Sequence, residues 1–126
     1  MATSSATYHE PLDKLSSTTQ DVHRALVSLQ EELEAVDWYG QRAEACEDAE
    51  LKAILLHNMR EEIEHAAMVL EWLRRRVPDF NRHLRTYLFQ DTSIVDREDV
   101  ATAAETGAPA PSPRRLSLTV GAMKED

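Results

Sequence analysis

The chain has 126 residues, of which 23 are acidic and 14 are basic, and its formal net charge is −9. This length predicts a single domain, and the acidic balance argues against nucleic acid as a partner. Because no run of about 18 apolar residues occurs, we expect no membrane-spanning helix. The polar start of the chain lacks the apolar core of a signal peptide, and the single Cys46 cannot form an internal disulfide, which together favour a cytoplasmic location.

Residues 1–10 are predicted to be a disordered N-terminus. From Pro11 to about Glu44, apolar residues recur at spacings of three and four, which predicts a long amphipathic helix. Glu32 is the only carboxylate inside this stripe. The stripe comprises Leu12, Leu15, Thr19, Val22, Ala25, Leu29, Glu32, Val36 and Tyr39.

A second helix is predicted from Ala49 to about Arg76, with Asp48 as its N-cap and Pro78 as its stop. Cys46 should lie at the end of the first helix. The short loop between two long helices predicts that they pack antiparallel, as a hairpin. The stripe of the second helix is apolar at its ends and polar at its centre: Leu51, Leu55, Asn58, Glu62, His65, Val69 and Trp72.

Asp79 is expected to cap a short third helix that contains Phe80 and Leu84, so that the folded part covers residues 11–90. Residues 91–113 are rich in Asp, Glu, Thr, Ala and Pro, which predicts a flexible linker. Residues 114–126 are apolar again, at Leu116, Leu118, Val120 and Met123. Their alternation suits an extended peptide that docks into a groove, although a merely apolar tail has the same pattern.

The polar centre of the second stripe predicts a metal site. Glu62 and His65 are three residues apart and share one face of a helix, and an antiparallel hairpin places Glu32 at a similar height. A Glu on one helix with Glu-x-x-His on another is half of a carboxylate-bridged dinuclear site. No second half occurs in the chain, so we expect a symmetric dimer of hairpins to complete both the site and a four-helix bundle.

Oxygen and imidazole ligands without a nearby thiolate favour iron or manganese, although zinc could also bind them. The alternative is a polar layer that only fixes the register of the helices. Glu31 and Glu34, beside the stripe, are either a solvated face or a site that collects cations. Trp38 and Tyr39 are expected to pack, and Tyr39 could also hydrogen-bond near the metal. His57 lies off the stripe and is expected to be exposed or to contact a partner.

Four runs of this sequence, residues 31–39, 61–66, 70–75 and 83–89, resemble the encapsulated ferritins, which are cargo proteins of encapsulin nanocompartments. The resemblance implies oxidation of Fe(II) to Fe(III) at a di-iron site between two protomers, in a ring of five dimers. It assigns ligand roles to Glu32, Glu62 and His65. It also implies that Trp38 and Tyr39 lie beside the site and that Glu31 and Glu34 are positions by which metal approaches it.

The chain's last residues also resemble the shell-targeting peptide of that family. The run from Leu118 to Lys124 has its alternating aliphatics, glycine and base, but contains Ala122-Met123 where Ser-Leu is commoner. Leu118, Val120 and Met123 are the expected docking residues, and Met can fill a pocket for Leu.

The residue pattern predicts an all-α protein whose hairpins dimerise into a four-helix bundle, which the resemblance makes ferritin-like. The resemblance further implies a ferroxidase cargo protein inside an encapsulin shell in the cytoplasm, holding two iron ions per dimer, with Glu62 bridging and Glu32 and His65 terminal. Two alternatives remain: a metal-binding cargo without turnover, and a structural helical dimer with a polar register layer.

Overall fold

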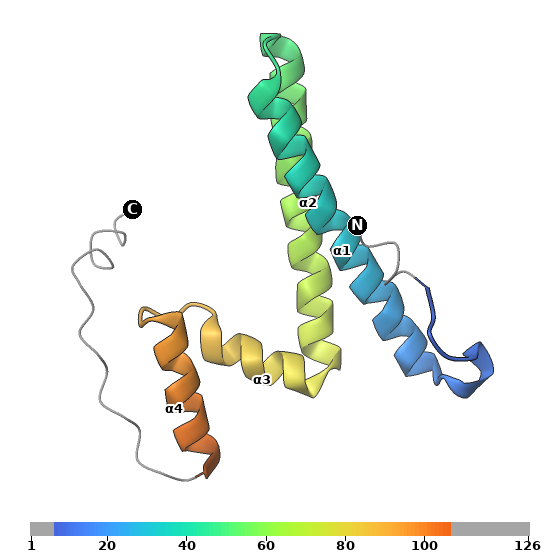
Figure 1. The fold of residues 1–126 in the computed structure, drawn as a ribbon, viewed down its shortest axis with the longest axis vertical. Helices are drawn as coiled ribbons and strands as arrows, with labels where there is room; N and C mark the ends of the chain where they lie inside the picture. Colours follow the sequence, from blue (N-terminus) through green and yellow to red (C-terminus); the bar gives the residue numbers. More distant parts are fainter. Residues whose placement is uncertain (1–6, 107–126) are drawn as a thin grey trace. The chain divides into compact units, whose positions relative to one another are not determined.

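The computed structural model describes residues 7–106, and every regular element in that range is a helix. After a 3-10 helix, η2 (Leu12–Lys14), come α1 (Ser17–Ala45), α2 (Ala49–Arg76), α3 (Pro78–Tyr87) and α4 (Ile94–Thr106) (Figure 1). The all-α prediction is thus confirmed for this range. The expected docking residues Leu118, Val120 and Met123 lie outside it. No described helix combines the length and apolarity needed to cross a membrane.

The chain divides into two compact units, a hairpin unit that ends at Arg76 and a second unit that begins at Val77. In the hairpin unit, α1 and α2 pack against each other, and Figure 1 shows them joined by a short turn. The predicted antiparallel hairpin is confirmed. The helices approach closely near Gly40, where an added Cβ would lie 3.4 Å from the Met59 sulfur.

The hairpin turn follows the sequence prediction. Asp48 Oδ2 accepts a hydrogen bond from the Leu51 backbone N–H at 2.8 Å, which is the expected N-cap of α2. Cys46 lies at the C-terminal end of α1, as expected, and its thiol donates to the Asp48 carbonyl at 3.6 Å. The far end of α2 falls at Arg76, two residues before Pro78.

The start of α1 differs from the prediction. The helix begins at Ser17, and Ser16 caps it by accepting a hydrogen bond from the Thr19 backbone N–H at 3.1 Å. Leu15 has an extended backbone, with φ −105° and ψ 132°, so it separates η2 from α1. The Ser16 cap favours a helix that begins at Ser17, because it satisfies a backbone N–H group of the first turn that would otherwise lack a partner.

The described residues bury few side chains. Ala43, Ala66 and Leu73 of the hairpin unit are buried, with Ala103 of α4. Many large apolar side chains stay exposed, including Leu33, Trp38, Leu51, Ile54, Ile63 and Met68. Exposed apolar surface on this scale is typical of chains that associate.

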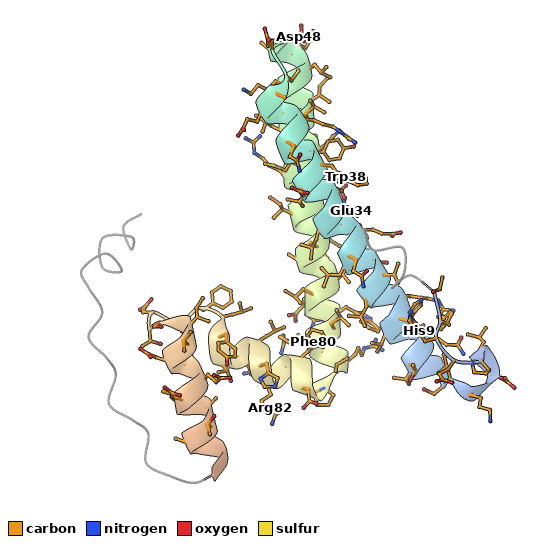
Figure 2. All side chains as sticks on the ribbon, in the orientation of Figure 1. His9, Glu34, Trp38, Asp48, Phe80 and Arg82 are labelled. Carbon is orange, nitrogen blue, oxygen red and sulfur yellow. The ribbon has the colours of Figure 1, made fainter. Side chains whose placement is uncertain are left out.

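The second unit contains α3 and α4. Pro78 occupies the first helical position of α3 and no side chain caps the helix, so the prediction that Asp79 is the cap is wrong. Pro78 already has the φ angle that a first turn requires and has no N–H to satisfy. The Asp79 carboxylate instead pairs with Arg82 at 3.2 Å, and Figure 2 shows Arg82 and Phe80 on this helix.

Helix α4 lies where the sequence predicts a flexible linker, so that prediction is wrong for residues 94–106. Alanine is the strongest helix former, and Ala101, Ala103 and Ala104 supply three of the helix's residues. A tertiary contact supports it, because Arg97 Nε donates to the Thr86 carbonyl at the end of α3 at 3.0 Å. That carbonyl belongs to the last turn of α3, where intrahelical partners are lacking.

Candidate metal centre

Glu32, Glu62 and His65 converge at the middle of the hairpin. One ligand atom from each lies within 4.8 Å of the others, and no second group of this kind occurs among the described residues. His65 Nδ1 lies 3.6 Å from Glu32 Oε2 and 3.5 Å from Glu62 Oε1. The structure thus brings together the three side chains that the sequence predicts as ligands.

Two helices position this cluster. Glu32 comes from α1, whereas Glu62 and His65 stand one turn apart on α2, where an i,i+3 pair shares a face. The side chains of Glu32 and Glu62 are 25% and 24% exposed, and that of His65 is 46% exposed. The cluster is therefore at the edge of the helix–helix contact and remains open on one side.

The two carboxyl groups perturb each other. The pKa of Glu32 is raised above its ordinary value, first by its side-chain hydrogen bond with Glu62, then by partial burial and by repulsion from the same carboxylate. His65 opposes this rise through its charge and its hydrogen bond. A divalent cation between the carboxylates would remove the repulsion, because opposite charge favours the ionised form of both.

His65 presents a specific atom to the cluster. Nδ1 is the nitrogen that faces both carboxylates, so it is the candidate ligand atom. One imidazole nitrogen and carboxylate oxygens form a donor set that suits iron, manganese and zinc. With three protein atoms from one hairpin, the coordination shell of a metal ion keeps positions for further ligands.

The other predicted positions lie outside the cluster. Glu31 is exposed and Glu34 is half-buried, and neither belongs to the group of three. Figure 2 labels Glu34 and Trp38 along α1. His57, on α2, is exposed, which agrees with one of the two expectations for it. The roles predicted for Glu31 and Glu34 remain predictions.

Arg42 contacts two aromatic rings, which was not predicted from the sequence. The guanidinium of Arg42 lies 5.9 Å from the ring centroid of Trp38 and 5.5 Å from that of Tyr39. These distances are typical of cation–π pairs. The sequence spacing could have indicated this contact. Arg42 follows Trp38 by four residues and Tyr39 by three, and residues at these spacings lie on the same face of a helix.

The fold and this cluster can now be compared with known proteins. Residues 7–91 match the EncFtn-like family. This chain belongs to that family. The encapsulated ferritin-like protein of Rhodospirillum rubrum is 57% identical over 105 residues, which cover 83% of this chain and 75% of the relative. The ferritin-like protein of Thermotoga maritima is 52% identical over 92 residues, covering 73% and 81%.

Two further comparisons agree with this membership. The encapsulin nanocompartment cargo protein EncC of Myxococcus xanthus is 30% identical over 124 residues, which cover 93% of this chain and 95% of the relative. A crystal structure of a Nitrosomonas europaea protein superposes with a TM-score of 0.67 at 60% identity, covering 69% of this chain and 96% of that one. The resemblance to encapsulated ferritins found in the sequence is confirmed.

Proposed function

We propose that this EncFtn-like protein is a ferroxidase, which oxidises Fe(II) to Fe(III) at a site that two copies of the chain complete. The observation that carries the proposal is the convergence of Glu32, Glu62 and His65 within 4.8 Å on two helices. Membership of a family whose relatives are described as encapsulated and ferritin-like supports iron as the metal.

One hairpin supplies only half of a dinuclear site. A two-fold axis beside the open edge of the cluster would double its ligands to four carboxylates and two imidazoles, because such an interface presents the same patch twice. We assign Glu62 to the bridging position and Glu32 and His65 to terminal positions. The exposed apolar side chains of the hairpin support this assembly, since a partner would cover them.

The residues of the chain suit both oxidation states of iron. Iron is the substrate here, and two adjacent ions together supply two electrons to dioxygen. The carboxylates of Glu32 and Glu62 are hard, anionic oxygen donors, so they offset the greater charge of Fe(III). His65 Nδ1 adds a neutral imidazole donor beside the two carboxylates.

We propose that the chain works as cargo inside an encapsulin shell in the cytoplasm. Two relatives support this, because one is described as encapsulated and another as an encapsulin nanocompartment cargo protein. The shell would be engaged by residues 114–126 through Leu118, Val120 and Met123, with five dimers in a ring. Iron mineral would then accumulate in the shell, with Glu31 and Glu34 guiding ions towards the site and Trp38 and Tyr39 lying beside it.

The test is Fe(II) oxidation by the full chain, followed by Fe(III) absorbance together with oxygen uptake and bound metal per dimer. Replacing Glu32, Glu62 or His65 by Ala should each abolish rapid oxidation. Glu50→Ala removes an exposed carboxylate and His83→Ala removes an exposed imidazole, neither of which belongs to the cluster, and both variants should keep the wild-type rate. Wild-type rates in all three cluster variants would overturn the proposal.

The alternatives are separated by the same measurements. A cargo that only binds metal would retain iron in proportion to protein but consume little oxygen. A structural dimer whose polar layer sets helix register would neither bind metal nor change its assembly when a chelator is added.

A further inference from the structure

Asn58 is the one polar residue in the stripe of α2 that the proposed metal centre leaves without a role. Its side chain is half-buried, as is that of Leu55 one turn before it, whereas His57 and Arg60 beside it are exposed. Among residues 7–104, no hydrogen-bond partner satisfies its carboxamide. In the single hairpin this amide still reaches solvent, because no fully buried side-chain N or O atom of the described residues lacks a partner. The partner of the proposed dimer would remove that solvent, and an amide without a hydrogen bond then costs free energy, so a leucine would suit this position better if packing alone mattered.

The spacing of Asn58 points to Glu62. The two residues are four apart on α2, so their Cβ atoms are separated by about 5–6 Å. Glu62 Oε1 already faces His65 Nδ1, on the side towards the end of α2. Asn58 lies on the other side of Glu62 along the same face, within reach of the carboxylate, whose oxygens have more lone pairs than the contacts with His65 and Glu32 occupy.

The chemistry of an amide suits that position. A lysine or arginine would attract Glu62 but repel the metal ion, and an acid would repel Glu62 itself. A carboxamide N–H donates to a carboxylate without adding charge. Hydrogen bonds of this outer kind fix the orientation of metal-binding carboxylates, and losing one typically costs about 10- to 100-fold in metal affinity.

We propose that Asn58 is a positioning residue for the metal centre, donating from Nδ2 to the carboxylate of Glu62 and so fixing the orientation in which that carboxylate meets the metal. This inference rests on the proposed function, because it assumes that Glu62 is a ligand. Asn58 touches neither iron nor dioxygen, and its effect passes through Glu62.

The test uses the full chain, with Zn²⁺ affinity measured by calorimetry and the visible absorption of bound Co²⁺ as a report on coordination. Asn58→Leu keeps the shape and removes the amide, and should lower Zn²⁺ affinity by about 10- to 100-fold and alter the Co²⁺ spectrum. Asn58→Gln keeps a carboxamide within reach of Glu62 and should restore most of the affinity. Leu55→Ala, a half-buried change on the same stripe, should lower thermal stability and leave the Co²⁺ spectrum unchanged.

Three outcomes would overturn the inference. Asn58→Leu could bind Zn²⁺ and Co²⁺ like the wild type, or Asn58→Gln could lose as much affinity as Asn58→Leu. Asn58→Leu could also change assembly equally with and without a chelator, as a register layer predicts. If Asn58→Leu does not fold, Asn58→Ala is compared with Asn58→Gln in its place. Failure of the wild type to bind either ion would instead refute the metal centre itself.

Discussion

His65 and Glu32 lie on different helices, yet His65 Nδ1 is 3.6 Å from Glu32 Oε2 across the hairpin. This contact joins α1 to α2 at the open edge of the hairpin, where the His65 side chain is 46% exposed and that of Glu32 is 25% exposed. It makes the spacing of the two helices a condition for any metal that binds the cluster. The contact therefore links the packing of the hairpin to its proposed chemistry.

The first prediction concerns the cost of keeping Glu32 charged in the metal-free protein. Because the folded pKa of Glu32 is raised, folding is favoured by this group below its ordinary pKa, and that contribution is lost as pH rises through the raised value. Glu32→Gln should therefore match or exceed the wild type in melting temperature at pH 7 with a chelator present. The difference should shrink as the pH falls, because protonation of the Glu32 carboxyl group removes the charge that glutamine lacks.

The same Glu32→Gln variant should lose metal. Its Zn²⁺ affinity should fall by more than about 100-fold, since even an outer-shell partner of a ligand contributes 10- to 100-fold. Opposite signs for stability and affinity would mark Glu32 as a functional carboxylate. A variant that is less stable than the wild type without metal would argue that Glu32 serves the fold.

The second prediction concerns the hairpin turn. Asp48→Ala removes the hydrogen bond to the Leu51 N–H and should lower the free energy of unfolding by about 1 kcal/mol. Asp48→Asn is the matched control, because asparagine caps helices nearly as well and should recover most of the loss. Urea titrations monitored by circular dichroism will measure both. Equal losses in the two variants would show that the charge matters more than the cap.

The third prediction concerns the ion pairs of Glu71. Arg74 and Arg75 lower the pKa of Glu71 to about 2 through hydrogen bonds of 2.7 Å each from their Nε atoms. The stabilising effect is thus present above the ordinary pKa of a glutamate and is lost as pH falls towards 2. Because the Glu71 side chain is 41% exposed and that of Arg75 is 69% exposed, solvent screens these pairs, and Glu71→Gln should lower the melting temperature only slightly at pH 7. One molar salt should remove most of that difference, and a difference that persists would indicate a packing effect.

These helices could be predicted to different extents from the sequence. The extents of α2 and its cap follow from strong local signals: a regular apolar spacing, Asp48 at the start and Pro78 after the end. The start of α1 did not follow, because the spacing of Leu12 and Leu15 continues the stripe although Leu15 is extended. The spacing of apolar residues indicates which residues could share a helix face, but it does not indicate at which residue the helix begins.

Helix α4 could not be predicted because its apolar residues follow no helical stripe and its support comes from another element. Arg97 donates a hydrogen bond to the Thr86 carbonyl of α3, and no pattern within residues 94–106 predicts this contact. The candidate site was easier to predict from the sequence than α4, because Glu32, Glu62 and His65 are polar residues within otherwise largely apolar stripes. The sequence did not predict that Arg42 covers Trp38 and Tyr39, nor that Nδ1 is the nitrogen of His65 that faces the carboxylates.

The fourth prediction concerns the contact between α3 and α4. Arg97→Ala removes the hydrogen bond to Thr86, so the amides of residues 94–104 should exchange with deuterium about fivefold faster or more. Amides of the hairpin unit should exchange at the wild-type rate, which provides the internal control. Unchanged exchange in α4 would mean that the helix is held by its own residues alone.

The fifth prediction concerns shell loading. A chain that ends at Pro113 should oxidise Fe(II) as fast as the full chain but should no longer copurify inside encapsulin shells. A full-length variant in which Leu118, Val120 and Met123 are all serine keeps the length and should also fail to load. Normal loading of either variant would place the targeting signal elsewhere in the chain.

The half-site in each hairpin has a consequence for mixtures of chains. In the proposed dimer each copy contributes one Glu32, one Glu62 and one His65, so a single altered codon would remove two ligands from every dimer of identical subunits. In a cell that makes normal and altered chains together, a third kind of dimer would arise with one intact half and one damaged half. If such hybrids bind iron without oxidising it, an altered allele would suppress more activity than its share of the chains. The mutation would then be dominant, because the two copies share one site.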